Sequence, residues 1–348
     1  MDKQLILSVA GSGKTKYLID KLNLNSWFLI ITYTNNNFFN IKLRVIEKFG
    51  FLPENIRIFT YFSFLYSFCF RPFLARQLKV KGVSYEVCPY VKASGRARYI
   101  DNFGRAYSNR LAKLINVEKA TDGLIERLNK YFDVVMIDEI QDFAAHDFNF
   151  LAHIVKSNND VFFVGDFFQH TFDTSRDGNT RQNLHNNYEK YIKECKNFGL
   201  TIDATTLDGS YRCSPTICNY VSSNLGINII SKRMDETEIK FLDSEDDILE
   251  ICNDDDVIKL FYKNSSSYEI YSNNWGNSKG IDSYHDVCVV LNPTTFSKYQ
   301  NNSLSSLNEQ TKNKLYVAIT RCRGNLFFVE EKLVKHLKTK LKSRKISF

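Results

Sequence analysis

The sequence predicts an α/β fold made of two domains, each built on a parallel sheet covered by helices on both faces. Apolar runs of strand length recur along the 348 residues, with helical stretches between them. Several runs are continuous rather than alternating, which is typical of strands buried on both faces of a parallel sheet. The length and an apolar fraction of 43% are sufficient to fill two cores of ordinary size.

The order of the expected elements defines the domains. The strands are expected at 5–9, 27–32, 56–59, 134–137, 161–164, 201–206, 258–261, 287–291 and 326–329. Residues 66–130 break the alternation and are basic and aromatic, so we expect a helical insertion there. The first domain then covers residues 1–65 and 131–204, and the second covers 205–348.

The loop after the first expected strand is suited to hold a triphosphate. It consists of Ala10, Gly11, Ser12, Gly13, Lys14 and Thr15. The two glycines let backbone N–H groups approach phosphate oxygens, Lys14 can reach the β- and γ-phosphates, and the Thr15 hydroxyl can ligate Mg²⁺. A helix from residue 16 would place its N-terminus beneath the phosphates. Val9 stands where the strict pattern has glycine, and a chance Gly-Lys-Thr triplet is the alternative explanation of the loop by itself.

Two further expected strands end in polar residues. Residues 134–137 run into Asp138 and Glu139, at the sheet edge where ligands bind in doubly wound folds. Asp138 can hold Mg²⁺, and Glu139 can orient and deprotonate an attacking water. The alternative is a pair of surface acids. After strand 161–164, Gln169 is placed to sense the γ-phosphate or that water.

Two arginines lie in the second half of the chain. Arg212 follows Tyr211, and Arg321 follows an apolar run and Thr320. The planar guanidinium of arginine can donate two hydrogen bonds to the departing γ-phosphate and balance its negative charge. Such arginines complete a site only if the second domain closes over nucleotide bound to the first; chance occurrence is the alternative.

The distribution of charge along the chain indicates which kind of partner the protein binds. The net charge is +7, and residues 71–130 hold thirteen Lys or Arg against five Asp or Glu, including Arg96, Arg98, Arg105 and Arg110. Such a segment suits a polyanion such as nucleic acid, whereas the basic stretch 331–348 can equally be a solvated helix.

The eight cysteines form no Cys-x-x-Cys pair, so we expect buried thiols and no zinc site. We expect no membrane span, no signal peptide and a cytoplasmic location.

The order of the motifs resembles that of a known family. The matching segments are 10–15, 31–35, 60–64, 137–142, 164–169, 211–212, 279–282 and 316–321. Together they resemble the UvrD/Rep-like branch of superfamily-one helicases over nearly the whole chain. The resemblance implies two RecA-like P-loop NTPase domains, with ATP and Mg²⁺ in the cleft between them and single-stranded DNA across the top.

The resemblance also implies roles for single residues. Lys14 and Thr15 bind phosphate and magnesium, Asp138 is the magnesium carboxylate, and Glu139 is the catalytic base. Gln169 links the γ-phosphate to the DNA site, Tyr211 stacks on adenine, and Arg212 and Arg321 contact the γ-phosphate. Asp282 stands where the family usually has Glu, which leaves its expected ribose contact open. The residues expected to touch the DNA backbone are Thr32, Thr34, Thr60 and Ser63.

Three departures from the family leave two functions open. The chain has no adenine-reading Gln segment well before the phosphate loop, and Phe172 is the nearest aromatic to the family's base-stacking position. Fewer than about 70 residues separate Arg212 from Lys279, too few for the relatives' inserted regulatory subdomain. We expect a DNA helicase or translocase on single strands or tailed duplexes, moving 3′ to 5′. The alternative is a DNA-sensing ATPase subunit that regulates a partner such as a nuclease, for example in anti-phage defence.

Overall fold

The computed structural model describes residues 1–86, 88, 94–171 and 180–341. The chain forms two compact units. The first consists of Met1–Leu7, Lys14–Gly165 and Phe172–Ala204, and the second of Ser8–Gly13, Asp166–Thr171 and Thr205–Phe348. Two short segments from the first half of the chain, one of them in the glycine-rich loop, therefore pack with the second unit.

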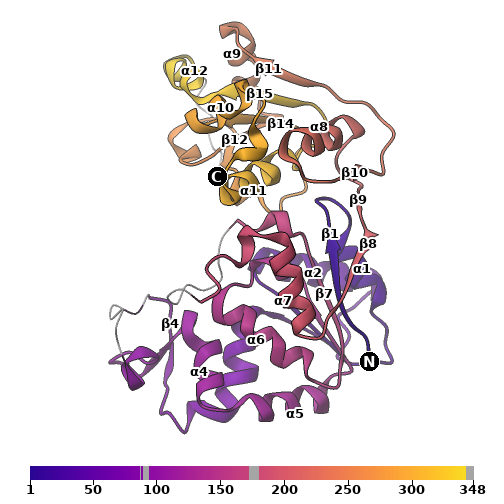
Figure 1. Ribbon diagram of the computed structural model, residues 1–348, viewed down its shortest axis with the longest axis vertical. Coiled ribbons are helices and arrows are strands. Elements are labelled where there is room, and N and C mark those ends of the chain that lie inside the picture. Colours follow the sequence, from indigo (N-terminus) through magenta and orange to yellow (C-terminus); the bar gives the residue numbers. More distant parts are fainter. Residues whose placement is uncertain (87, 89–93, 172–179, 342–348) are drawn as a thin grey trace. The chain divides into compact units, whose positions relative to one another are not determined.

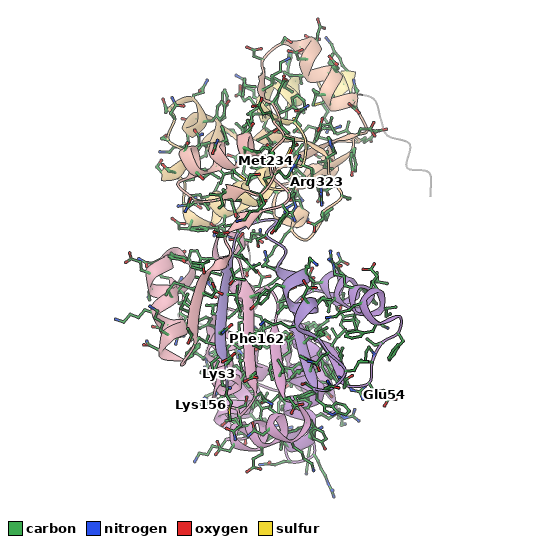
Figure 2. All side chains as sticks on the ribbon, turned by 90° about the vertical axis from the view of Figure 1, so that its right-hand side faces the viewer. Lys3, Glu54, Lys156, Phe162, Met234 and Arg323 are labelled. Carbon is green, nitrogen blue, oxygen red and sulfur yellow. The ribbon has the colours of Figure 1, made fainter. Side chains whose placement is uncertain are left out.

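A six-stranded sheet carries the first unit. Its order is β3-β2-β6-β7-β1-β8. The strands are β1 (Lys3–Ser8), β2 (Phe28–Thr32), β3 (Ile56–Thr60), β6 (Val134–Ile137), β7 (Asp160–Gly165) and β8 (Thr201–Leu207). The pairs among β3, β2, β6, β7 and β1 are parallel, and Figure 2 labels Lys3 on β1 and Phe162 on the neighbouring β7. Every residue of β2 is buried, as a continuous apolar run predicts.

Helices and short elements surround this sheet. The α-helices are α1 (Lys14–Lys21), α2 (Asn35–Phe49), α3 (Tyr61–Ser63), α4 (Leu111–Val117), α5 (Thr121–Tyr131), α6 (Ala145–Val155) and α7 (Tyr188–Asn197). Figure 1 shows α4, α5 and α6 gathered together, and these helices contact one another. The Thr34 side chain caps α2 by accepting the Asn37 N–H at 3.2 Å, and Gly50 ends the helix at φ 80°.

The segment expected as a helical insertion has mixed structure. It contains the π-helix η1 (Phe64–Ala75), the 3₁₀ turns η2 (Gly95–Arg98) and η3 (Ser108–Arg110), and the helices α4 and α5. It also holds a small parallel sheet that the sequence did not suggest, β4 (Gly82–Ser84) with β5 (Arg105–Tyr107). The remaining short turns of the first half are η4 (Ile140–Asp142), η5 (Phe167–Gln169) and η6 (Leu184–Asn186).

The second unit has a parallel five-stranded sheet of order β11-β15-β14-β12-β13. The strands are β11 (Ile239–Leu242), β12 (Val257–Phe261), β13 (Ser272–Asn274), β14 (Asp286–Leu291) and β15 (Leu326–Glu330), and a separate pair is β9 (Gly209–Ser210) with β10 (Ile230–Ser231). The helices are α8 (Pro215–Leu225), α9 (Glu245–Asn253), α10 (Pro293–Gln300), α11 (Glu309–Ile319) and α12 (Glu331–His336). Four short turns complete it, η7 (Ser265–Ser267), η8 (Gly276–Ser278), η9 (Leu304–Ser306) and η10 (Lys338–Lys340).

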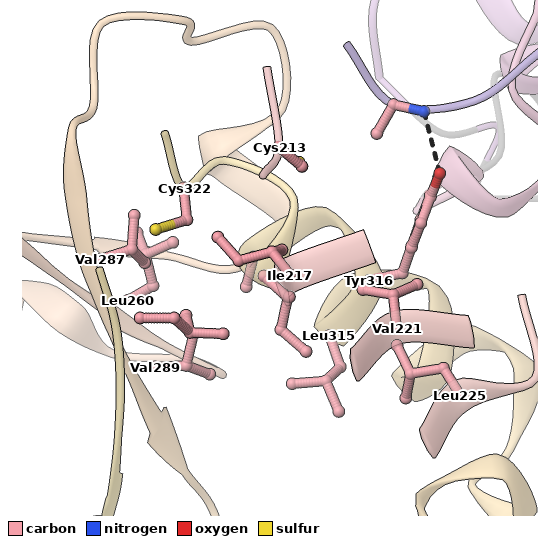
Figure 3. Packing of buried hydrophobic residues seen from close by; sticks show 14 of the residues in the cluster. Cys213, Ile217, Val221, Leu225, Leu260, Val287, Val289, Leu315, Tyr316 and Cys322 are labelled. Atoms are coloured by element: carbon pink, nitrogen blue, oxygen red, sulfur yellow. Dashed lines mark hydrogen bonds between the residues drawn. The ribbon is translucent and has the colours of Figure 1, made fainter. Parts of the chain in front are cut away.

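Successive residues of the second sheet fill two separate cores. One face carries Ile258, Leu260, Val287, Val289, Leu326 and Phe328 and packs against α8 and α11, as Figure 3 shows for Ile217, Val221 and Leu315. The other face carries Val257, Phe261, Cys288, Val290 and Val329 and packs against α9 and α12. Helices therefore cover both faces, as a doubly wound sheet requires.

The predicted α/β fold with parallel sheets is confirmed. Each of the nine expected strands corresponds to a strand of the structure. The strands β9, β10, β11 and β13 of the second unit were missed: β9 and β10 have two residues each, Lys240 interrupts β11, and β13 is made of Ser and Asn, so none gives an apolar run. All eight cysteines lie among the described residues, are buried and form no disulfide. Within the described ranges, no helix is long and apolar enough to cross a membrane.

Candidate nucleotide and nucleic-acid sites

The glycine-rich loop packs closely against the segment around Arg212 in the second unit. Gly11 has φ +72°, and a Cβ atom there would lie 2.6 Å from the Arg212 Cβ and 2.7 Å from the Ser210 Oγ. The Tyr211 N–H donates to the Gly11 carbonyl at 2.9 Å. Gly13 also has a positive φ, of 88°. Both glycine positions of the loop therefore need residues without a side chain.

The same loop has features that fit a phosphate group. The Ser12 side chain is 3% exposed, and its Oγ has no hydrogen-bond partner among the described residues. The helix α1 begins at Lys14, directly after Gly13, so its free N–H groups follow the loop. A buried, unpaired hydroxyl beside a helix N-terminus is a place where an anion satisfies several donors at once.

In the first unit, Thr15 and Asp138 form a hydroxyl and carboxylate pair. The Thr15 hydroxyl donates to Asp138 Oδ2 at 3.5 Å, and Asp138 is only 2% exposed. Asp138 directly follows β6, where its N–H donates to the Ile31 carbonyl at 2.9 Å. Oxygen ligands of these two kinds are those that Mg²⁺ prefers, so the residues present fit that ion.

Glu139 is held beside this pair in an unusual backbone conformation. Its φ is +58°, its side chain is buried, and its N–H donates to Asp138 Oδ1 at 3.1 Å. The amide of the fully buried Gln141 donates to a Glu139 carboxylate oxygen. Gly165 makes room for Gln141 and Ile140, because a Cβ atom there would collide with the Gln141 side-chain oxygen and lie 2.7 Å from Ile140 Cγ2. Gln141 lies within the matching segment 137–142, but the sequence alone assigns it no role.

In the second unit, both predicted arginines converge on Asp282. Arg212 forms an ion pair with Asp282 Oδ1 and donates to the Thr320 carbonyl at 3.0 Å. Arg321 lies 3.5 Å from the same carboxylate oxygen and donates to the Ile281 carbonyl at 3.2 Å. Both guanidiniums belong to buried residues, whereas Tyr211 is 65% exposed and open to a planar ligand. Asp282 was predicted as a ribose contact and here joins the two arginines.

Arg233 is a neighbour that the sequence did not reveal. One of its guanidinium nitrogens donates to the Arg212 carbonyl and also to the Arg323 carbonyl, at 2.7 Å to the latter. Its Nε donates to Asp235 at 2.7 Å. Arg233 thus holds the backbone beside both predicted γ-phosphate arginines. It lies in none of the motifs, so no spacing signal could have found it.

Gln169 lies in the turn η5, beside Asp166. The Asp166 side chain caps this turn by accepting the Phe168 N–H at 3.1 Å. Gln169 is 2% exposed, and its Nε2 has no hydrogen-bond partner in the part of the chain that the structure describes. Phe172, the other residue considered near this motif, lies outside the described residues.

Three of the four predicted DNA contacts line one cavity of the first unit. Thr34, Thr60 and Ser63 open onto a cavity of about 430 Å³, together with Phe62 and Tyr85. Thr60 also caps α3, where its hydroxyl lies 2.9 Å from that of Ser63. The fourth residue, Thr32, is fully buried at the end of β2 and does not line this cavity.

Aromatic rings border the same cavity and its neighbour. Tyr85 is 76% exposed, and its ring centroid lies 5.0 Å from that of Phe62. A second cavity of about 400 Å³ shares Thr60 and Ser63 with the first and is lined by Phe38 and Phe39. We call these two cavities the hydroxyl groove. Hydroxyls beside accessible rings are the combination that binds the backbone and bases of a single strand.

The basic residues of the insertion differ in their surroundings. Arg96 is exposed on η2, and Arg98 is partly exposed on the same turn. Arg105 forms a 2.7 Å ion pair with Asp101. Arg110 is 7% exposed and donates to the Arg98 carbonyl at 2.6 Å, so its charge is directed into the fold. We therefore retain Arg96, Arg98 and Arg105 as predicted nucleic-acid contacts.

Comparisons with known proteins agree with the fold. The family described as the UvrD/REP helicase N-terminal domain matches residues 90–176. No curated protein matches the sequence significantly. A solved complex of the arterivirus nonstructural protein 10 helicase with DNA has a TM-score of 0.50 and 12% identity, covering 96% of this chain and 63% of that protein.

Two further solved structures also match. The PRRSV helicase has a TM-score of 0.48 and 15% identity, covering 98% of this chain and 54% of that protein. The arterivirus protein in a further crystal structure has a TM-score of 0.48 and 12% identity, covering 95% and 61%. The chain thus spans less than two thirds of the length of each of these proteins. The matched segment contains Asp138, Glu139 and Gln169. Residues 90–176 are therefore similar to the UvrD/REP helicase N-terminal domain, and the ordered motifs on either side of that segment resemble the same family.

Proposed function

We propose that this protein binds and hydrolyses ATP with Mg²⁺ and uses the energy to move along single-stranded DNA. The observation that carries the proposal is the hydrogen bond between the Thr15 hydroxyl and the Asp138 carboxylate. Thr15 belongs to the loop that contains the two positive-φ glycines, Gly11 and Gly13. A nucleoside triphosphatase needs at least a phosphate-binding loop and oxygen ligands for Mg²⁺.

Each residue of the site has a distinct role in this proposal. Thr15 and Asp138 hold Mg²⁺, which when bound screens the negative charge of the phosphates. Lys14 contacts the β- and γ-phosphates, and Glu139 accepts a proton from the attacking water. The amide of Gln141 fixes the orientation of the Glu139 carboxylate. Arg212 and Arg321 stabilise charge on the departing phosphate, Tyr211 stacks on adenine, and Asp282 contacts the ribose or competes for the arginines.

The proposed track for the nucleic acid is the hydroxyl groove. Thr34, Thr60 and Ser63 would contact phosphates, and the rings of Tyr85 and Phe39 would stack on bases. Arg96, Arg98 and Arg105 would attract the strand electrostatically. A relative of the same fold was solved with DNA, which supports nucleic acid as the ligand. Movement from 3′ to 5′ is expected from the family.

One observation favours a second candidate function. Residues 213–278 form α8, α9 and three strands of the second sheet, β11, β12 and β13, and they leave no stretch for a separate inserted domain. A chain without that subdomain suits a DNA-sensing ATPase that regulates a partner such as a nuclease. Under this alternative the same residues bind ATP and DNA, but the protein separates no strands by itself.

Two measurements test the proposal. DNA-stimulated ATP hydrolysis is expected under both candidates, whereas unwinding of a 3′-tailed duplex is expected only of a helicase. Glu139→Gln should retain ATP binding and lose hydrolysis by orders of magnitude, because the base is lost while Thr15 and Asp138 remain. Hydrolysis at the wild-type rate in this variant would refute the assignment of the base. Hydrolysis without strand displacement at any salt concentration would favour the sensing subunit.

A further inference from the structure

Tyr316 of α11 makes two buried hydrogen bonds with one hydroxyl group. The Ala10 N–H donates to the Tyr316 oxygen at 2.9 Å, which Figure 3 shows, and the Tyr316 O–H donates to Asp166 Oδ2 at 3.0 Å. Tyr316, Ala10 and Asp166 are all 0% exposed. The hydroxyl is therefore used fully as both acceptor and donor in a region closed to water.

Each partner of this hydroxyl leads to a residue of the proposed site. Ala10 begins the phosphate loop, one residue before Gly11. Asp166 uses its other carboxylate oxygen to cap the turn that ends at Gln169. Tyr316 itself lies on α11, five residues before Arg321, which follows the end of that helix. Three of the motifs thus meet at one oxygen atom.

Two further contacts join α11 to the turn at Asp166. The ring of Tyr316 lies 6.2 Å from that of Phe168 in an edge-on arrangement. The Asn313 side chain donates to the His170 carbonyl at 3.2 Å. The turn is therefore anchored to the helix on both sides of Gln169, and the Tyr316 hydroxyl extends that connection to the loop.

The protonation state of Tyr316 is fixed over the whole working range. Burial, and then the neighbouring Asp166 carboxylate, raise the pKa of Tyr316 well above 10.0. The group consequently remains a donor at any pH at which hydrolysis is measured. A hydrogen bond to a carboxylate is stronger than one between neutral groups, so this link resists disruption.

We propose that Tyr316 is a positioning residue that couples the phosphate loop to the Gln169 turn, so that a change at the nucleotide is transmitted to nucleic-acid binding. This inference rests on the proposed ATPase function. The hydroxyl touches no reacting atom in this scheme. It sets the position of Gln169 relative to the loop, and its removal leaves the glycines, Lys14 and Thr15 in place.

The test is Tyr316→Phe, which removes the hydroxyl and retains the ring. The matched control is Tyr220→Phe, because the Tyr220 hydroxyl is buried, packs beside the same core and makes no hydrogen bond among the described residues. ATP hydrolysis is measured with and without a single-stranded oligonucleotide, and KM and kcat are determined separately. We expect Tyr316→Phe to lose about tenfold or more of the DNA-stimulated kcat. Its KM for ATP and its unstimulated rate should change little, and Tyr220→Phe should behave as wild type.

The possible results separate the inference from the proposed function. Wild-type stimulation in Tyr316→Phe would overturn the inference, as would an equal fall in stimulated and unstimulated rates. If the wild-type protein itself shows no ATP hydrolysis, the proposed function fails instead. Should Tyr316→Phe not fold, Asp166→Asn provides a milder break of the same link, since the amide oxygen still accepts one hydrogen bond. It should show a smaller loss of stimulation, and an unchanged stimulation ratio would overturn the inference.

Discussion

Replacing Gly11 with alanine tests the proposed phosphate loop most directly. The loop backbone approaches the Arg212 segment so closely that a Cβ atom would lie 2.6 Å from the Arg212 Cβ and 2.7 Å from the Ser210 Oγ. Ordinary contact begins near 3.4 Å, and both obstacles are close to the backbone rather than at the end of a flexible chain. Either the loop or residues 210–212 must therefore move.

The cost has two parts. Gly11 has φ +72°, and the left-handed conformation costs a residue with a side chain about 1 kcal/mol. Separation of the two segments also breaks the 2.9 Å hydrogen bond from the Tyr211 N–H to the Gly11 carbonyl, worth about 1 kcal/mol. We expect Gly11→Ala to destabilise the second unit by about 2–3 kcal/mol and to weaken nucleotide binding at least about tenfold.

Gly226→Ala is the matched control. Gly226 has φ +68°, in the same unit, and a Cβ atom there meets nothing within 4 Å. It should cost only the strain of about 1 kcal/mol and leave nucleotide binding unchanged. Stability can be followed in urea by the fluorescence of Trp275, which is fully buried in the second unit, and binding by titration with a fluorescent ATP analogue. If Gly11→Ala and Gly226→Ala behave alike in both assays, the reasoning about the loop is wrong.

Three further predictions concern the arginines, the hydroxyl groove and a buried lysine. Arg321→Ala should lower kcat much more than ATP affinity, because its charge acts mainly on the transition state; a loss of affinity at full turnover would contradict this role. Phe39→Ala should weaken binding of a single-stranded oligonucleotide by about 1–3 kcal/mol. Phe51→Ala, a substitution at a similarly exposed ring outside the groove, should not (58% and 56% exposed). Burial lowers the pKa of Lys259 from 10.5, so between the two pKa values the unfolded chain holds more protons and stability rises with pH. The stability of Lys259→Met relative to wild type should therefore be greater at pH 7 than at pH 10, whereas a pH-independent difference in urea midpoint would refute this.

The sequence was sufficient for the fold because the relevant signals are local. Every residue of the run Phe28–Thr32 is buried, and a strand can bury both of its faces only between two layers of helices. The helix starts are equally readable, since Ser214 before Pro215 and Asn292 before Pro293 both cap a helix with their side chains. The polar strand β13 lacks such a signal, because its pairing with β12 comes from the tertiary structure.

The candidate site was predictable only where it coincides with motifs. The pairing of Thr15 with Asp138 links residues 123 positions apart, yet each stands at the end of a recognisable element. Arg233 and the double hydrogen bond of Tyr316 depend on distances between segments far apart in sequence, which no spacing encodes. Thr32 shows that a motif can also mislead. Its motif predicted a DNA contact, but Thr32 is fully buried at the end of β2.

We propose that nucleotide binding would rearrange the contacts of the two arginines. Arg212 and Arg321 share the single carboxylate of Asp282, and each also donates to a backbone carbonyl. Both belong to buried residues, where a guanidinium is stable only with good acceptors. A longer side chain at position 282 would have more rotamers in which to leave the arginines, so the shorter acid favours the shared ion pair. The terminal phosphate of ATP offers separate anionic oxygens that can accept from both guanidiniums, and its binding would release Asp282 to contact the ribose. We propose that the predicted ribose contact and the observed ion pair are successive states of the Asp282 side chain, before and after the phosphate binds.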